Sequence, residues 1–403
     1  MTFGGQWVDL GALPIDRGGG ILLRRAAAAA QPGERVEVRG SDPSLAVHLR
    51  AWARREGHRW EEPPMTAQAA LAFVRGDAAD ARRAGSTLAG YPDPRHPGAV
   101  AERAAAAWGI APRGAEVEAG APPHTVALME KCECWADDLP ALLRHALASQ
   151  WNPQEAIPWD QSHSGSEEVE SALVQILTYL IENETAALLI SARFAAQVHP
   201  HFREAMQLLA LQSAEEARHI EVFTQRATMR HSRLGSSTAG GQASLRTLLE
   251  EPRFPESSLL LSVLGEGTFV DLLRFLQEHA PDTCTATIMR LAAQDESRHV
   301  AFGMAHLSRM LAIDPSRLPL LELAMERRHA ALRDTAGLNE EVFESLVVLA
   351  GGGLAPADIA RGFDSVAHLM KQMHAGRRRR LETLGFDPTR ADALAGLHTR
   401  NFM

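Results

Sequence analysis

The chain has 403 residues, of which 45% are hydrophobic and 23% charged, as is typical of a soluble globular protein with one large core and room for a smaller domain. A formal net charge of -9 argues against a general nucleic-acid binder, and three cysteines are too few for a disulfide framework. The N-terminus lacks the pattern of a leader, and no apolar run approaches the length that spans a bilayer. We therefore expect a cytoplasmic protein without nucleic-acid or membrane partners.

The first part of the chain predicts a small α+β domain over residues 1–62. Residues 35–39, RVEVR, alternate polar and apolar side chains as a half-buried strand does. Helical patterns over residues 20–30 and 44–56 flank this strand. Glycine and proline turn signals continue beyond the domain, so we expect a linker and lead-in segment over residues 63–136.

The remainder of the chain, residues 137–403, predicts a helical domain. Strand signals almost vanish there, and long stretches with helical periodicity are separated only by short segments rich in glycine and proline. The helices expected after residue 315 also have apolar faces. They either wrap around the preceding helices or form the contact face of a homodimer.

Two short stretches of the helical part are near copies of each other: EEARHIEVF over residues 215–223 and DESRHVAFG over residues 295–303. Each places a Glu three residues before a His, so both side chains lie on one face of a helix, one turn apart. An isolated pair of this kind is most often a surface Glu and a core His. Two copies favour a metal site, because carboxylate and imidazole together suit iron, manganese or zinc.

Each copy has a further glutamate upstream, within an otherwise apolar helical stripe. Glu184 precedes Glu216 by 32 residues and Glu266 precedes Glu296 by 30, enough for a helix to end, turn and return to the same depth. An ionised carboxylate buried without a partner is very costly, so a cation is expected opposite each of these residues. Glu182 is an alternative to Glu184, although it lies on a less apolar stripe.

Over about residues 124–313 the chain resembles ferritin-like diiron carboxylate proteins, and the following residues match the metal ligands and catalytic centre of that group: Glu184, Glu216, His219, Glu266, Glu296 and His299. The resemblance implies a four-helix bundle whose helices supply these six side chains. It also implies that Glu215 and Asp295 orient the ligand histidines of the opposite motif. The lead-in QWNPQEAIPWD over residues 150–160 is similar to a segment that precedes the bundle in oxygenase-like members. Arylamine N-oxygenases of this group carry an additional ligand histidine where this chain has Ala292.

The resemblance implies a dinuclear non-haem iron enzyme, a monooxygenase or oxidase, that uses O2 as co-substrate to oxidise a small organic molecule. A Mn/Fe pair in place of two Fe ions is consistent with the same ligands. The sequence has no motif that binds a flavin, nicotinamide or iron–sulfur cluster, so a separate reductase or ferredoxin is expected to supply electrons. Two alternatives remain: a ferroxidase or iron-handling protein, and a binding module in which the metal is structural.

The N-terminal domain resembles a different family, the small TusA-like sulfur carriers. The resemblance covers residues 7–60 and depends on PGERVEV over residues 32–38, followed by Asp-Pro and a helix. The working Cys-Pro of that family is replaced here by Ile15 and Asp16. Because persulfide transfer requires a thiolate, we expect a docking or structural role for this domain.

Overall fold

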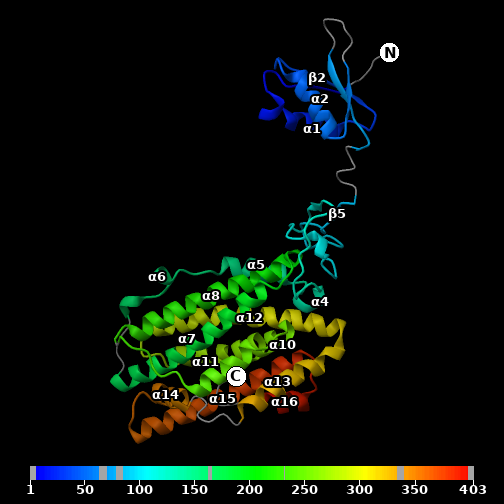
Figure 1. Ribbon diagram of the computed structural model, residues 1–403. Coiled ribbons are helices and arrows are strands. Elements are labelled where there is room, and N and C mark those ends of the chain that lie inside the picture. Colours follow the sequence, from blue (N-terminus) through cyan, green and yellow to red (C-terminus); the bar gives the residue numbers. More distant parts are fainter. Residues whose placement is uncertain are drawn as a thin grey trace. The chain divides into compact units, whose positions relative to one another are not determined.

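The computed structural model describes residues 6–62, 70–78, 85–161, 166–230, 232–333 and 340–397 (Figure 1). The chain divides into two compact units. Unit 1 contains Met1–Ala89 and Glu116–Pro122, and unit 2 contains Gly90–Ala115 and Pro123–Met403. The expected boundary after residue 62 adjoins residues 63–69, which lie outside the described part.

Unit 1 is an α+β unit built on a four-stranded sheet in the order β1-β2-β4-β3. Its strands and helices are β1 (Gln6–Asp9), α1 (Gly19–Ala29), β2 (Arg35–Arg39), α2 (Leu45–Arg55), β3 (Arg59–Glu61) and β4 (Leu71–Val74). The predicted strand is β2, and the two predicted helices agree with α1 and α2 to within one residue at each end. β2 pairs parallel to β1 and antiparallel to β4. Val36 and Phe73 face the helices in a separate core, and β5 (Thr87–Leu88) pairs with β6 (Glu116–Val117).

Unit 2 is organised around four long helical segments that form a bundle (Figure 1). They are α7 (Glu167–Ala195), α8 (Arg203–Thr228), η5 continuing into α11 (Leu259–Glu266 and Gly267–Glu278), and α12 (Thr283–Ile313). α7 packs along α8, and α11 packs along α12. Side-chain caps fix two of the starts, since Ser166 accepts from Val169 N and Asp282 accepts from Thr285 N. The predicted mainly α fold with a four-helix bundle is confirmed.

Shorter helices precede and connect the bundle helices, and further helices follow them. The α-helices are α4 (Lys131–Cys134), α5 (Leu139–Ala148), α6 (Pro153–Ala156), α9 (Ala239–Leu249), α10 (Phe254–Ser258), α13 (Leu318–Leu332), α14 (Glu340–Gly351), α15 (Pro356–Thr383) and α16 (Pro388–Ala395). The 3-10 turns are η1 (Ile15–Arg17), η2 (Ala106–Trp108), η3 (Trp159–Gln161), η4 (Pro200–Phe202) and η6 (Pro315–Arg317). α14 packs on α7 and α15 packs on α11, so the C-terminal helices cover the bundle (Figure 1).

By length and apolar composition alone, one helix of the described ranges, α7, could cross a membrane, which the sequence analysis did not expect. Of the apolar window that passes this test, 67% is buried inside the protein. α14 and α15 pass only as a pair that is bent by 112°. α7 is apolar because it is a central helix of the bundle, in contact with α8, α9 and α14.

Candidate metal centre

The bundle helices bring six acidic and imidazole side chains together in its interior. They form two groups of four, in each of which one ligand atom per residue lies within 4.8 Å of the others. The first group is Glu184, Glu216, His219 and Glu296; the second is Glu216, Glu266, Glu296 and His299. Two residues, Glu216 and Glu296, belong to both groups. These are the six positions that the sequence analysis selected, and the groups could hold two metal ions.

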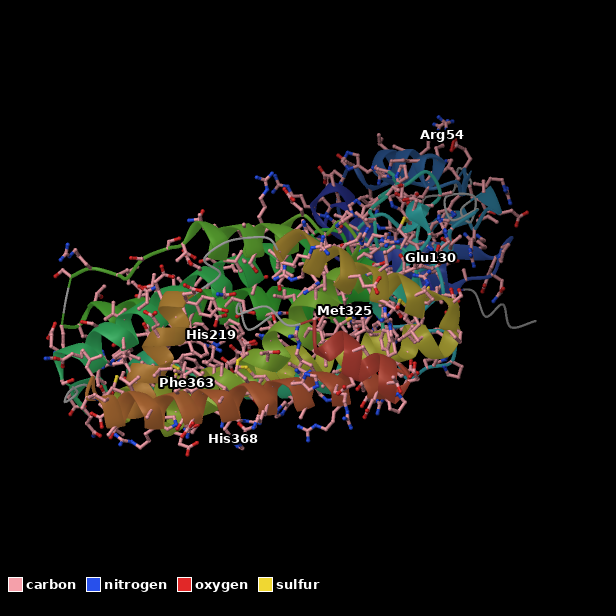
Figure 2. The ribbon with its side chains drawn as sticks, turned by 90° about the horizontal axis from the view of Figure 1, so that it is seen from below. Arg54, Glu130, His219, Met325, Phe363 and His368 are labelled. Atoms are coloured by element: carbon pink, nitrogen blue, oxygen red, sulfur yellow. The ribbon has the colours of Figure 1, made fainter. Side chains whose placement is uncertain are left out.

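The two histidines face the carboxylates through the same ring atom. His219 Nδ1 lies 3.3 to 3.5 Å from carboxylate oxygens of the three glutamates in its group (His219 is labelled in Figure 2). His299 Nδ1 lies 3.3 Å from Glu216 Oε1 and 3.4 Å from Glu296 Oε2. This convergence follows from the i,i+3 spacing on α8 and α12, which directs each Glu and His of a motif into the same space.

Five of the six side chains present a buried polar atom that has no hydrogen-bond partner among the described residues. These atoms are Glu184 Oε1, Glu216 Oε2, His219 Nδ1, Glu266 Oε2 and Glu296 Oε1. Buried polar atoms in proteins are almost always satisfied, and leaving several acceptors unsatisfied in one place is costly. Oxygen and imidazole nitrogen acceptors that converge on a common space fit divalent cations, so the residues present fit a metal pair.

The other ring nitrogen of each histidine bonds to an acid of the opposite motif. His219 Nε2 lies 3.0 Å from Asp295 Oδ2, and His299 Nε2 lies 2.7 Å from Glu215 Oε2. A carboxylate only accepts, so Nε2 carries the hydrogen and the Nδ1 lone pair faces the interior of the cluster. This is the crossed arrangement that the resemblance implied for Glu215 and Asp295.

Two arginines, each directly before one of the histidines in sequence, donate hydrogen bonds to these acids. Arg218 Nη2 donates to Asp295 Oδ2 at 2.7 Å. Arg298 Nη2 donates to Glu215 Oε1 at 2.7 Å. Although burial acts to raise the pKa of Glu215 and Asp295, hydrogen bonds from the histidines and the nearby arginines hold both pKa values below the usual range. Both acids therefore stay ionised as acceptors for the histidines.

The lead-in segment reaches the same acids, which sequence reasoning did not foresee. Gln150 Nε2 donates to Glu215 Oε1 at 2.5 Å. Trp151 Nε1 donates to Asp295 Oδ2 at 2.8 Å, and the Arg218 guanidinium lies 4.3 Å from the Trp151 ring centroid. The only sequence signal for these two residues was the similarity of the lead-in QWNPQEAIPWD to a segment of oxygenase-like proteins.

Glu266 lies at the end of a π-helix, another feature that the sequence did not reveal. The π segment η5 runs over Leu259–Glu266, and α11 continues from Gly267. π-helical turns are rare and often occur at functional sites, because the wider turn changes the direction of a side chain. Gln212 Nε2 donates to Glu266 Oε1 at 2.6 Å and fixes this carboxylate.

Without ions, the electrostatics of the cluster oppose full ionisation. Burial raises the pKa of Glu184, Glu216 and Glu266, and the neighbouring carboxylate of Glu296 raises it further in each case. Burial also acts to raise the pKa of Glu296, but attraction to His299 and His219 holds it at about 2. Such mutual repulsion is the expected state of a site that is built for cations.

The structure distinguishes Glu184 from its alternative. Glu184 is 3% exposed and belongs to the cluster, whereas Glu182 is half-buried and outside both groups.

Two further residues near the ligand positions in sequence are buried. Burial raises the pKa of the Tyr179 phenol above its usual range. Ala292 is fully buried on α12 in the core.

A cavity of about 20 Å³ adjoins the cluster, enough for about one water-sized group. Glu184, Glu266 and Glu296 line it on one side. Its other walls are Asn183, Ala187, Leu245, Leu248, Leu261, Gly265 and Phe269. All but one of these are apolar or lack a side chain, so the cluster borders a predominantly apolar space.

No protein-family model matches the sequence, and no curated protein matches it. Among solved structures, the chain is similar to an R2-like ligand-binding oxidase with an aerobically reconstituted metal cofactor, with a TM-score of 0.44 and 16% identity over 65% of this chain and 90% of that chain. A variant of an R2-like ligand-binding oxidase with an Fe/Fe cofactor gives a TM-score of 0.48 and 18% identity over 62% and 94%. A protein from Synechococcus with aldehyde deformylating oxidase activity gives 0.40 and 18% over 57% and 96%.

Proposed function

We propose that the protein is an O2-dependent oxidoreductase with a dinuclear non-haem iron centre held by the six clustered side chains. The observation that carries this proposal is the set of five buried, unpartnered acceptor atoms on four helical segments. When bound, two iron ions would supply the redox chemistry that amino-acid side chains lack. The same ligands accept a Mn/Fe pair.

The sharing of residues between the two groups assigns roles to the ligands. Glu216 and Glu296 belong to both groups and would bridge the two ions. Glu184 and His219 would bind one ion, and Glu266 and His299 would bind the other; Glu215 and Asp295 fix the histidine rings. Because each motif supplies one histidine and one bridging carboxylate, the near-copies in the sequence give a nearly symmetric site.

A chain of hydrogen bonds connects the cluster to the edge of the bundle and supports a separate electron donor. Trp151 is partly exposed and donates to Asp295, which in turn accepts from His219. Aromatic and hydrogen-bonded groups of this kind provide a route for electrons between a protein partner and a buried metal. We therefore assign the docking of a reductase or ferredoxin to the face that presents Trp151.

The apolar cavity beside Glu184, Glu266 and Glu296 favours a small organic substrate with an apolar reacting part. Because the cavity has room for about one water-sized group, Leu248, Leu261 and Phe269 would contact only the reacting end of such a molecule and exclude water from it. The substrate determines whether the reaction inserts an oxygen atom into it or only removes electrons from it. The proposal thus covers monooxygenase and oxidase outcomes.

For unit 1 we propose a docking role. Its sheet and helices follow the strand and helix pattern on which the TusA-like resemblance depended, and Ile15 and Asp16 stand in place of the family's Cys-Pro. Both positions lie in η1, directly before α1. A partner that recognises this surface without a sulfur transfer step would bring the substrate or the electron donor to the enzyme.

The metal centre is tested by loading the protein with Fe(II) in the absence of oxygen and measuring bound iron. Wild type should bind about two iron ions per chain, as a two-metal site requires. Glu184→Gln removes a negatively charged ligand and should lower this to about one ion, with loss of O2 consumption. Glu182→Gln, two residues away on α7 and outside the cluster, is the matched control and should bind iron as wild type does.

Three results would contradict the proposal. Wild type that binds fewer than two ions at saturating Fe(II) would exclude the dinuclear centre. Loss of folding in metal-free protein, with no O2 chemistry in the loaded form, would indicate a structural metal. Turnover of many irons per site with growth of a mineral core, in the absence of an organic substrate, would indicate a ferroxidase.

A further inference from the structure

A cluster of two buried arginines and one partly buried arginine lies outside the metal centre, between the C-terminal helices and the bundle. Its members are Arg328 on α13 and Arg377 and Arg380 on α15, called here the arginine cluster. Arg328 is 9% exposed and Arg377 is 4% exposed. Burial lowers the pKa of Arg328 to about 9 and that of Arg377 to about 10; the charge of Arg377 lowers the pKa of Arg328 further, and the charge of Arg380 does the same to Arg377. Among the described residues, no carboxylate lies within ion-pair distance of either.

The arginines of the cluster differ in how their N–H groups are satisfied. Arg328 donates to Ser244 O and Ser244 Oγ at 2.9 and 3.1 Å and also to Thr247 Oγ1. Arg377 Nε and Nη1 and Arg380 Nε and Nη2 are buried and have no hydrogen-bond partner in the described part of the chain. The charge of Arg380 is partly offset by the nearby Asp271. A buried, unpaired guanidinium is costly, so the two unused donors of Arg377 require a compensating group.

A small cavity lies between Arg328 and Arg377. Its volume is about 20 Å³, which suits one water-sized species. The remaining lining residues are Leu260, Leu264, Met325, His329, Leu332, Leu394 and Leu397. Met325 is labelled in Figure 2. Within the described part of the chain no acidic residue lines the cavity, so its polar character is positive and its other walls are mostly apolar.

We propose that this cavity binds a small monovalent anion of the size of chloride, held by Arg377 and Arg328. A monoanion loses less solvation in an apolar cavity than a multiply charged anion does, and it accepts hydrogen bonds from several guanidinium donors at once. A larger anion exceeds the volume, and a water molecule would leave the positive charges uncompensated. Two walls of the cavity, Leu260 and Leu264, belong to the π segment that ends at Glu266.

The proposal is tested with the full-length protein by titrating sodium chloride against sodium gluconate at constant ionic strength. Because an anion that binds only the folded state stabilises it by mass action, the melting temperature of wild type should rise by about 3 °C at saturation. Arg377→Met removes two of the unused donors and should abolish this rise. Arg379→Met, an exposed neighbour on α15, is the matched control and should retain it.

A second measurement covers the case in which Arg377→Met does not fold. Chlorine-35 NMR line broadening reports exchange of chloride with wild type directly, and Leu394→Phe, which fills the cavity while retaining all three arginines, should remove the specific broadening. Equal melting temperatures in chloride and gluconate for wild type would overturn the proposal. So would a chloride effect of the same size in the Arg377→Met or Leu394→Phe variant.

Discussion

At the residue scale, the six proposed ligands were accessible from sequence because each is fixed by local periodicity. The i,i+3 spacing places a Glu and a His on one face, and a glutamate within an apolar stripe points into the core. Gln150 and Trp151 were not accessible in this way, because their partners Glu215 and Asp295 are 65 and 144 residues away. Such contacts depend on tertiary packing, which no short-range pattern encodes.

The hydrogen bond from Trp151 to Asp295 gives a prediction at this scale. Trp151→Phe removes the Nε1–H donor while Arg218 and His219 continue to hold Asp295. Reduction of the oxidised iron-loaded protein by an external donor, followed by stopped-flow absorbance, should slow by roughly 10–100-fold. Trp159→Phe, whose indole donates to Pro153 O instead, is the control. An unchanged rate at unchanged iron content would exclude Trp151 from the electron route.

At the element scale, the helices were predicted well and their irregularities were not. The π segment η5 contains Leu260, Leu261 and Leu264, and the sequence predicts an ordinary α-helix there. A wider turn does not change the amino-acid composition, so the sequence gives no sign of it. The C-terminal helices were predicted to cover either the bundle or a second subunit. Their contacts with α7 and α11 favour the first. The sequence left both options open, because an apolar face alone does not specify its partner.

A buried ion pair connects three elements of the bundle. Arg226 on α8 is 1% exposed and donates to both oxygens of Glu170 on α7, at 2.7 and 3.0 Å. It also donates to Asp282, the cap of α12, at 2.7 Å. One guanidinium therefore sets the relative positions of the three helices at this end of the bundle.

We predict that Arg226→Met destabilises the protein strongly. The substitution removes the cation that donates to the buried Glu170 and Asp282 and leaves Glu170 only Arg230 Nη1 at 4.0 Å, and such a loss costs about 3–5 kcal/mol in systems of this kind. The free energy of unfolding in urea is the measurement. Arg230 also lies 4.0 Å from Glu170, but its side chain is 36% exposed, so Arg230→Met should change the free energy of unfolding by less than about 1 kcal/mol. A loss below about 1 kcal/mol for Arg226→Met would show that the pair contributes little.

At the scale of the whole molecule, one buried histidine makes stability depend on pH. His306 is fully buried, its Nε2 lies 2.8 Å from Ser258 Oγ, and burial lowers its pKa to about 3. Because an unfolded histidine has a pKa near 6.5, the unfolded state binds a proton below that pH and the folded state does not. Stability from this residue is therefore full above about pH 6.5 and is lost as the pH falls towards 3.

The predicted size follows from the two pKa values. Between pH 7 and pH 5, His306 should account for a loss of about 2 kcal/mol in the free energy of unfolding. Urea unfolding of His306→Gln at both pH values should show a difference that is smaller by that amount. His368→Gln, an exposed histidine on α15 that is labelled in Figure 2, should keep the wild-type difference. The same difference in both variants would assign the pH dependence to other groups.

The division of the chain gives the last prediction. The sequence placed the start of the helical domain at residue 137, whereas unit 2 also includes Gly90–Ala115. In that segment Arg113 is fully buried and donates to both oxygens of Glu204 at the start of α8, at 2.9 and 2.6 Å. Removing Arg113 would leave the buried Glu204 with only Arg203 Nε, 3.1 Å from its Oε1, so we expect a cost near the lower end of about 3–5 kcal/mol.

A chain of residues 90–403 should therefore bind iron as the full protein does, since every residue of the proposed centre and the whole of its core lie within it. A chain of residues 137–403 retains all six proposed ligands but lacks Arg113, and its free energy of unfolding should be lower than that of residues 90–403 by at least about 3 kcal/mol. Glu204→Gln in the shorter chain replaces the incompletely paired, buried charge by a neutral amide and should recover part of the difference. Equal stability of the two chains would place the boundary of the helical domain at residue 137 and reduce residues 90–115 to a linker.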